Sequence, residues 1–321
     1  SYRELPFAAF ELADSYRYEQ KGETLLCFRL RKFLMPDLHV FTRNLEEAKS
    51  MALKIQEKIF EEVKKLERSY VSIYNITRDF FEDNIDYITE LVKREGKPVL
   101  AVIYPPGIYY WVLNIEYNII DELRRPREIA TLQIDVGNAE RFDIKYIDEE
   151  GNERYPVIIH TAIIGSVERY IYAVLDKAVQ DEKAGKVPCI PTWLAPIQAR
   201  VIPVSSQYTE YAVKVLNKLL EAGIRADLDD RDLALGKKIR DAGIEWVPYI
   251  IVVGKREQNT NTINVRIRSL GIQKSMSTDE LTGLIRQDLR GYPQVDSALP
   301  TRLTRRPTLH YLRELTEQRK T

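Results

Sequence analysis

The chain has 321 residues and carries 48 Lys and Arg against 48 Asp and Glu, so its formal net charge is zero. An apolar content of 44% excludes a disordered chain, and no apolar run approaches the ~18–20 residues that cross a bilayer, so we expect no membrane partner. The start lacks the layout of a signal peptide and two cysteines cannot form a disulfide framework, which favours a cytoplasmic protein. At ~150 residues per domain, the length predicts two domains.

The first half of the chain predicts strands and helices in an irregular order. Alternating apolar residues predict a strand over residues 24–33, and helical spacing predicts helices over residues 45–66 and 81–94. Short apolar runs predict further strands at 99–104, 109–119, 129–136, 142–147 and 156–160, before an apolar helix at 166–177. Because the strands follow one another without regular helical crossovers, the pattern favours an α+β domain over a doubly wound one.

A proline-rich segment divides the chain. Three prolines between residues 187 and 196 predict a stiff linker over 189–196, which separates a domain at 1–188 from one at 197–300. After it, strands at 199–204, 225–228, 249–253 and 263–268 alternate with helices at 209–221, 235–242 and 278–289. This alternation predicts a small α/β domain with a mostly parallel sheet. Residues 301–321 form a basic tail in which His310 has no evident role.

Net neutrality conceals a difference between the two parts. Residues 189–321 contain 21 Lys and Arg against 15 Asp and Glu, whereas residues 1–188 hold the other 27 and 33. The second part is therefore basic by six charges and the first acidic by six. A difference of this size is a weak indication by itself, since two differently solvated surfaces would also produce it.

Two charged motifs together indicate a nucleotide site. In the first, Arg17 and Glu19 precede a loop and then Arg29; the second is Gly-Ser-Val-Glu-Arg-Tyr at residues 165–170. Alone, the first is more typical of an exposed strand with cross-strand ion pairs, and the second of a helix start capped by its serine. Present together, in this order, they resemble the second and third signature motifs of class II aminoacyl-tRNA synthetases.

This resemblance implies activation of an amino acid by ATP with Mg²⁺. Attack on the α-phosphate creates a crowded polyanion, which fixed guanidinium groups stabilise. Arg17 and Arg169 are the expected catalytic pair, Phe33 would stack on adenine, and Gly165 would let the backbone approach the nucleotide. The implied ATP-binding set is Arg17, Glu19, Arg29, Phe33, Gln133, Ser166 and Arg169. For Gln133, a polar position on a half-buried strand is an equally good explanation.

Two of the three histidines flank these motifs, since His39 follows the first and His160 precedes the second. This layout is similar to that of the threonyl-tRNA synthetases, in which a cysteine and two histidines hold a zinc ion. The resemblance implies Zn²⁺ on His39 and His160, L-threonine in contact with Asp37, and a homodimer when the protein is complete. A metal that requires a hydroxyl ligand rejects valine, which an apolar pocket distinguishes poorly from threonine.

The part after the linker resembles the anticodon-binding domain of the same family. The matching motifs are Gly-Ile-Arg-Ala-Asp at 223–227 and Gly-Lys-Lys-Ile-Arg at 236–240. The second domain is therefore expected to bind tRNA-Thr, with Arg231, Lys237 and Arg240 as candidate RNA contacts. Lys237 alone would be explained more simply as part of a solvated helix face.

The family's zinc cysteine and its first motif, which builds the dimer interface, lie upstream of a segment resembling residues 1–6. We therefore expect a C-terminal portion of a synthetase, and expect Cys27 to be a packing residue. Glu128 stands where other members have glutamine. The predicted function is threonine–tRNA ligase, which activates L-threonine and transfers it to the 3′ end of tRNA-Thr. The alternative is a non-catalytic tRNA-binding fragment or paralogue; the related prolyl enzyme is disfavoured because it does not use the two-histidine site.

Overall fold

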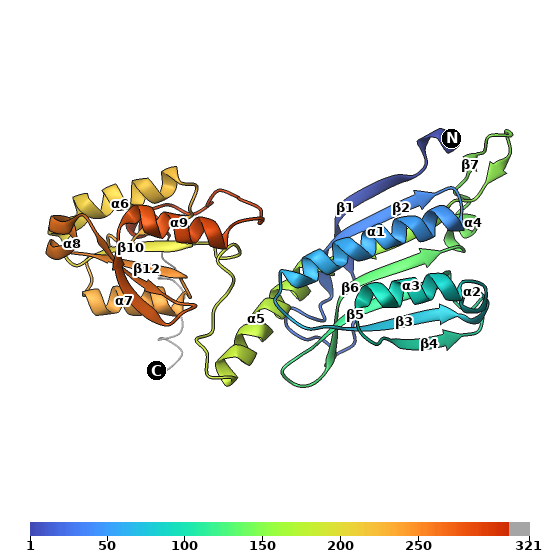
Figure 1. Ribbon diagram of the computed structural model, residues 1–321, viewed down its shortest axis with the longest axis horizontal. Coiled ribbons are helices and arrows are strands. Elements are labelled where there is room, and N and C mark those ends of the chain that lie inside the picture. Colours follow the sequence, from blue (N-terminus) through green and yellow to red (C-terminus); the bar gives the residue numbers. More distant parts are fainter. Residues whose placement is uncertain (308–321) are drawn as a thin grey trace. The chain divides into compact units, whose positions relative to one another are not determined.

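The computed structural model describes residues 1–307, which form two compact units, each with its own sheet (Figure 1). The first unit is Ser1–Gln180 and the second begins at Asp181. Within the described residues, no helix has the length and apolar character needed to span a membrane.

The first unit is built on a seven-stranded sheet with the order β1-β2-β9-β6-β5-β3-β4. Every neighbouring pair is antiparallel except β3 and β4, which confirms the α+β expectation. Its strands are β1 (Phe7–Tyr16), β2 (Lys32–Thr42), β3 (Val71–Thr77), β4 (Leu100–Tyr104), β5 (Trp111–Ile120), β6 (Pro126–Asp135) and β9 (Val157–Ala162). The short strands β7 (Tyr146–Ile147) and β8 (Glu153–Arg154) form a separate hairpin.

Helices accompany this sheet. They are α1 (Leu45–Lys64), α2 (Arg78–Asp83), α3 (Ile85–Glu95), α4 (Asn138–Arg141) and α5 (Val167–Lys183). In Figure 1, α1 and α3 lie across the sheet, and α1 contacts β6 and β9. Alternate residues of the central strands, such as Leu113 and Ile115 on β5 and Ile134 on β6, are fully buried. Because side chains alternate along a strand, the residues between them point to the opposite face, which is free to carry a site.

The strand predicted over residues 24–33 is wrong. Extended structure begins at Lys32, and the preceding residues form turns with one isolated bridge between Leu25 and Arg29. Cys27 has a left-handed backbone, φ 59°, and Leu26 is 82% exposed, so the apolar alternation there does not mark a buried face. Conversely, the sequence did not predict β1. This edge strand has largely exposed apolar residues, which show no clear alternation with polar ones.

Two other elements of the first unit are shorter than predicted. The helix over 81–94 is two helices, α2 and α3, divided at Asn84 and ended by a left-handed Gly96. Of the strand over 142–147, Tyr146–Ile147 alone is extended, because Asp143 adopts a left-handed φ of 55° in the preceding turn.

The second unit has a five-stranded sheet in the order β11-β10-β12-β13-β14. Its strands are β10 (Ala199–Pro203), β11 (Ala226–Leu228), β12 (Tyr249–Val253), β13 (Ile263–Ile267) and β14 (Ile272–Met276). Its helices are α6 (Thr209–Glu221), α7 (Leu235–Ile244), α8 (Lys255–Thr260) and α9 (Thr278–Asp288), and Ser277 caps the last of them.

The prediction of a mostly parallel sheet is wrong for half of this sheet. The strands β11, β10 and β12 are parallel, but β13 and β14 run antiparallel to their neighbours. The short helix α8 is too small to bring the chain back across the sheet, because a parallel crossover needs about a dozen residues or more. A tight turn at Gly271, φ 65°, then joins β13 to β14.

Two flanking segments pack on the second unit. Within the expected linker, the Trp193 indole stacks on Tyr292 at 4.9 Å, and the buried guanidinium of Arg225 donates to the carbonyl oxygens of Trp193 and Ala195 at 2.7 and 3.0 Å. Residues 301–306, which we call the C-terminal strap, lie along the outer edge of β11, the end strand of the sheet. The rest of the expected tail, His310 included, lies outside the described residues.

The C-terminal strap is held by an edge contact and by acidic side chains. The N–H of Leu228 donates to the carbonyl of Thr301 at 2.8 Å. Both the N–H and the hydroxyl of Thr304 donate to the Asp230 carboxylate, at 3.0 and 2.8 Å. Arg306 donates to Asp227 at 2.7 Å, and Asp227 also accepts two hydrogen bonds from the fully buried Arg200.

Candidate functional site

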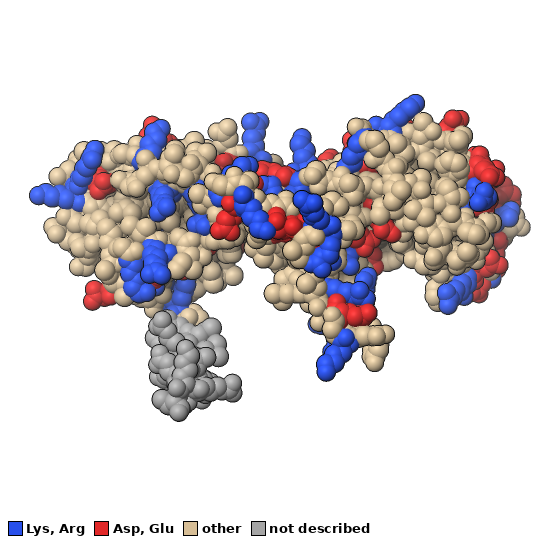
Figure 2. Space-filling model, turned by 90° about the horizontal axis from the view of Figure 1, so that it is seen from below, with Lys and Arg blue, Asp and Glu red and all other residues tan. Residues whose placement is uncertain are grey.

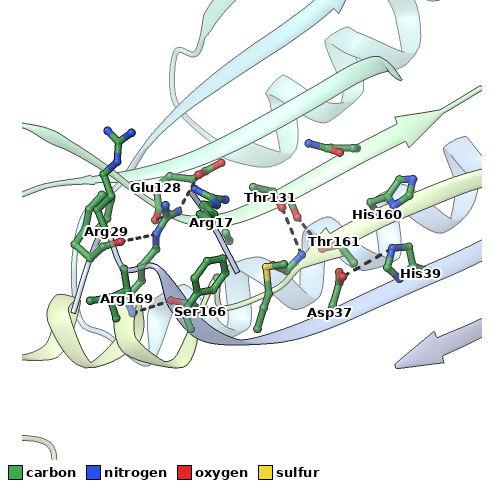
Figure 3. A pocket seen from close by; sticks show the side chains of 18 of the residues that line it. Arg17, Arg29, Asp37, His39, Glu128, Thr131, His160, Thr161, Ser166 and Arg169 are labelled. Atoms are coloured by element: carbon green, nitrogen blue, oxygen red, sulfur yellow. Dashed lines mark hydrogen bonds and ion pairs between the residues drawn. The ribbon is translucent and has the colours of Figure 1, made fainter. Parts of the chain in front are cut away.

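A cavity of about 330 Å³ opens on the face of the first sheet that carries polar side chains, and Figure 3 shows its lining. All ten of the residues predicted for ATP, threonine and metal line this one cavity: Arg17, Glu19, Arg29, Phe33, Asp37, His39, Gln133, His160, Ser166 and Arg169. The predicted residues are thus brought together from three strands, one loop and the start of a helix. Figure 3 shows the arginines at one end of the cavity and the two histidines at the other.

Strand register explains why distant residues meet. On β2, the positions 33, 35, 37 and 39 follow one another at every second residue, and all four line the cavity. His39 pairs with His160 on β9, and His160 pairs on its other side with Gln133 on β6. These three side chains therefore occupy one row across three adjacent strands.

At the arginine end, Arg169 is held from several sides. Its backbone N–H donates to the Ser166 hydroxyl at 3.1 Å, and its Nη1 donates to the Glu128 carboxylate at 2.9 Å. Its Nε donates to the carbonyl of Phe28, and the guanidinium lies 4.6 Å from the centre of that ring. Glu128, whose role the sequence left open, is thus the acidic partner that positions Arg169.

The other two arginines differ in their surroundings. Arg17 is exposed, and its guanidinium lies over the Phe33 ring at 5.2 Å; among the described residues it forms no ion pair. Arg29 donates to the buried carboxylate of Glu19 at 2.7 Å, and this bond raises the pKa of Arg29. Arg17 is therefore free to meet an anion, whereas Arg29 already stabilises the loop.

The backbone of Gly165 lies close to the backbone of the neighbouring strand β6. Its φ is +65°, and a Cβ placed there would lie 2.8 Å from the carbonyl oxygen of Ile129 on β6. Gly165 also lines the cavity, so the expected approach to a nucleotide stays a prediction, and the tight neighbour that the structure describes is the adjacent strand. The glycine lets the turn before α5 press against β6, and this fixes where Ser166 and Arg169 begin.

At the other end, the two imidazole rings meet edge to face with their centres 4.7 Å apart. The Nε2 of His160 lies 2.7 Å from Oδ2 of Asp135, and the Nε2 of His39 lies 3.9 Å from Oδ2 of Asp37. Burial tends to raise the pKa of Asp135, but hydrogen bonds from His160 and from the N–H groups of Gly137 and Asn138 outweigh it and lower that pKa.

The two histidines supply part of the donor set that a zinc ion requires. Two imidazoles facing each other on neighbouring strands fit two positions of a tetrahedral site, which usually takes three protein ligands when it is catalytic. Among residues 1–307, no group of three or more His, Cys, Asp or Glu is placed to hold a metal. Cys27, in its turn at the arginine end, does not complete the pair.

Among the site residues that the sequence did not indicate, three contact predicted ones. Tyr110 donates from its hydroxyl to Gln133 at 2.9 Å, Phe28 packs beneath Arg169, and Asp135 bonds His160. Asp135 could have been found, because it is two residues after Gln133 on one strand and so shares its face. Tyr110 and Phe28 arrive from turns, where no periodicity marks the side chains that point inward.

The three candidate RNA contacts lie on the second unit but differ in whether acidic side chains already pair with them. Arg231 is clamped by Asp229, at 2.6 Å, and by Asp241, at 3.1 Å. Lys237 is exposed and 3.6 Å from Asp241, while Arg240 is exposed with no ion pair within the described residues. Arg240 lines a hollow of about 270 Å³ together with Arg266 and Arg268, which the sequence analysis missed, and no acidic residue lines it.

The hollow beside α7 is lined by arginines, and other basic residues lie on the surface of the second unit. Lys and Arg side chains are spread over the face of the second unit that Figure 2 shows. Arg268 itself is engaged, since it donates to the carbonyl groups of Pro188 and Gly243 at 2.8 Å each. Arg240 and Arg266 are consequently the cations that remain available to an anion there.

Two family models match the chain. Residues 1–178 match the family described as tRNA synthetase class II core domain (G, H, P, S and T), and residues 198–288 match the anticodon binding domain family. Curated proteins named threonine–tRNA ligase are similar throughout. The one from Thermofilum pendens is 60% identical over 307 residues, 96% of this chain, and the one from Staphylothermus marinus is 57% identical over 311 residues, 97% of it.

The chain spans about half the length of these curated relatives, 50% and 51% respectively. Among solved structures, the RNA binding domain of threonyl-tRNA synthetase from Cryptosporidium parvum Iowa II is 26% identical with a TM-score of 0.73, over 91% of this chain and 72% of that one. Prolyl-tRNA synthetase from Cryptosporidium parvum shares the fold, with a TM-score of 0.67 at 19% identity, over 90% of this chain and 57% of that one.

Proposed function

Because the chain belongs to the class II aminoacyl-tRNA synthetase core family, we propose that it is the C-terminal part of a threonine–tRNA ligase. The observation that carries this proposal is the single cavity that holds all ten predicted residues, with cationic groups at one end and two imidazoles at the other. The names of the relatives, at 55–60% identity, support threonine as the amino acid.

The arginine end is suited to a phosphate chain. The threonine carboxylate attacks the α-phosphorus of ATP and pyrophosphate leaves, so negative charge concentrates on the phosphoryl oxygens. Arg17, which has no acidic partner within residues 1–307, would stabilise this charge, and Arg169 would hold the other end of the triphosphate. No nucleophilic side chain is required, because catalysis of this kind depends on positioning and electrostatic stabilisation. Mg²⁺ would accompany ATP.

The histidine end is suited to the amino acid. His39 and His160 would supply two ligands to Zn²⁺, and a bound zinc ion would supply Lewis acidity toward the amino and hydroxyl groups of threonine. Asp37, beside His39 on the cavity wall, would accept a hydrogen bond from the substrate amino group. In the second unit, Arg240 and Arg266 are the best placed cations for the tRNA.

The complete protein should act in the cytoplasm as a homodimer.

The proposed ligase activity is tested by ATP–pyrophosphate exchange with the full-length enzyme. Exchange should depend on threonine, should be far weaker with valine, and should be absent with proline. Replacing Arg169 with Ala should abolish it with every amino acid, whereas replacing His39 with Ala should abolish it while ATP still binds. Absence of exchange in an enzyme that still binds tRNA-Thr would favour the second candidate, a non-catalytic tRNA-binding paralogue.

A further inference from the structure

We propose that Asp135 is a positioning residue that sets the tautomer of His160 and so decides which ring nitrogen keeps a free lone pair. The inference rests on the proposed function only in treating His160 as a metal ligand. Asp135 is 1% exposed, and its Oδ2 lies 2.7 Å from the Nε2 of His160. It belongs to none of the motifs that the sequence analysis singled out.

The orientation of Asp135 is fixed by donors from the turn that follows β6. Its Oδ1 accepts from the backbone N–H groups of Gly137 and Asn138, at 2.8 and 2.9 Å. Its Oδ2 accepts from the side-chain amide of Asn138 at 2.8 Å. The carboxylate thus faces hydrogen-bond donors on every side that the structure describes, so it acts as an acceptor.

An acceptor at this place requires His160 to carry its proton on Nε2. A neutral imidazole has one N–H and one bare nitrogen, so the proton on Nε2 leaves the lone pair of Nδ1 free. A histidine that binds a metal commonly donates its other N–H to a carboxylate, which fixes the ring orientation and the tautomer. The geometry therefore prepares Nδ1 of His160 for an electrophile.

The turn that holds Asp135 is itself fitted against another wall of the cavity. A Cβ on Gly137 would lie 3.2 Å from the Cα of Tyr110, and the N–H groups of Val136 and Gly137 both donate to the Tyr110 carbonyl. Tyr110 in turn donates to Gln133 and packs against the His160 ring at 5.9 Å. One turn thereby aligns the imidazole, Tyr110 and Gln133.

The variant Asp135→Asn isolates the tautomer. The backbone N–H of Asn138 donates to Oδ1 of this side chain, and that of Gly137 is shared between Oδ1 and the Tyr110 carbonyl, so the new amide would keep its oxygen toward them and turn its NH₂ toward His160. That NH₂ can only donate, so Nε2 must accept and the proton moves to Nδ1. The ring would stay in place with its free lone pair on Nε2 instead of Nδ1. Replacing the hydrogen-bond partner of a metal-binding histidine weakens metal binding by about 10–100-fold.

The matched control is Asp176→Asn. Asp176 is 8% exposed and accepts a charged hydrogen bond from Arg68 at 2.6 Å, yet it does not line the cavity. In the full-length enzyme, Asp135→Asn should weaken Zn²⁺ binding, measured by chelator competition, by about 10–100-fold and raise KM for threonine but not for ATP. Asp176→Asn should leave both unchanged. Undiminished zinc affinity in Asp135→Asn would overturn the proposal.

A second measurement does not depend on zinc. The chain has three histidines, so imidazole ¹⁵N resonances of the metal-free, ¹⁵N-histidine-labelled chain can be assigned with a His160→Gln variant. In the unsubstituted chain His160 should be the Nε2–H tautomer, and finding Nδ1–H there would overturn the proposal even if the Asn variant does not fold. If the full-length enzyme binds no zinc while His160 is Nε2–H, the metal assignment fails and the positioning role of Asp135 is supported.

Discussion

Gly165 combines two constraints that no other residue type satisfies. Its left-handed backbone disfavours any side chain, and a Cβ there would press into the Ile129 carbonyl. Both constraints act on the turn that delivers Ser166 and Arg169 to the cavity. A change at this position should therefore affect the site and the stability of the first unit together.

We expect Gly165→Ala to destabilise the first unit by about 1–3 kcal/mol and to reduce ATP–pyrophosphate exchange in the full-length enzyme. Gly151→Ala is the matched control, because Gly151 has φ +86° with no atom within 4 Å of the position of a Cβ. That variant should share the backbone strain but keep full exchange activity. Denaturant unfolding and exchange kinetics measure the two effects; equal activity of both variants would show that the contact with Ile129 is unimportant.

Among the elements, the C-terminal strap is held on the second unit by a few contacts. Arg306 reaches Asp227, which is fully buried beside Arg200, while the neighbouring Arg305 is exposed and forms no ion pair within the described residues. The strap also lies along the edge of β11, which would otherwise be an open sheet edge.

We expect Arg306→Ala to lower the free energy of unfolding of the second unit by about 2 kcal/mol, because a partly buried partner of a buried carboxylate is lost. Arg305→Ala removes the same charge from the same segment and should stay within about 0.5 kcal/mol of the unsubstituted chain. Denaturant unfolding followed by the fluorescence of Trp193 and Trp246 reports the second unit. A similar loss in both variants would mean that net charge, not the ion pair, matters.

Elements differ in how well the sequence predicted them, for physical reasons. The amphipathic helix at 45–66 and the apolar strand at 249–253 were predicted closely, since the helix buries one continuous face and the strand is buried on both of its faces. The loop around Cys27 was mistaken for a strand because its apolar residues serve a cavity wall and a turn instead of a sheet face. The direction of β13 depends on the length of a connection, which apolar patterning does not report.

The site residues were predicted from motif resemblance, and the structure brings those of the first unit into one cavity. What the sequence could not provide was the partner of each residue. Whether Arg17 or Arg29 has a free guanidinium depends on the placement of Glu19, and that placement follows from loop geometry.

At the scale of the whole molecule, charge is divided between the two parts of the chain. The basic excess lies in the residues from 189 onward, where long-range attraction to a polyanion would speed association with RNA. Local pairing then determines which cations are available. Arg240 has no ion pair within the described residues, whereas Arg231 is shared between Asp229 and Asp241.

We expect Arg240→Ala to weaken tRNA binding and to reduce the slope of log K against log salt by about 1, because one phosphate contact is lost. Arg231→Ala should change the slope less, since that guanidinium is already neutralised. Filter binding across a salt series with the full-length enzyme measures both. Identical slopes for Arg240→Ala and the unsubstituted enzyme would remove Arg240 from the RNA contacts.

The hydrogen bonds from Arg225 to the carbonyl groups of Trp193 and Ala195 determine where an isolated second unit should begin. The family match for this unit begins at residue 198, yet the carbonyl acceptors of the buried guanidinium lie before that point. A piece that started at the match would leave a buried cation without those acceptors and Tyr292 without its stacking partner. As a portable module, in gene fusion or in domain exchange, the unit should therefore carry residues 191–197 with it.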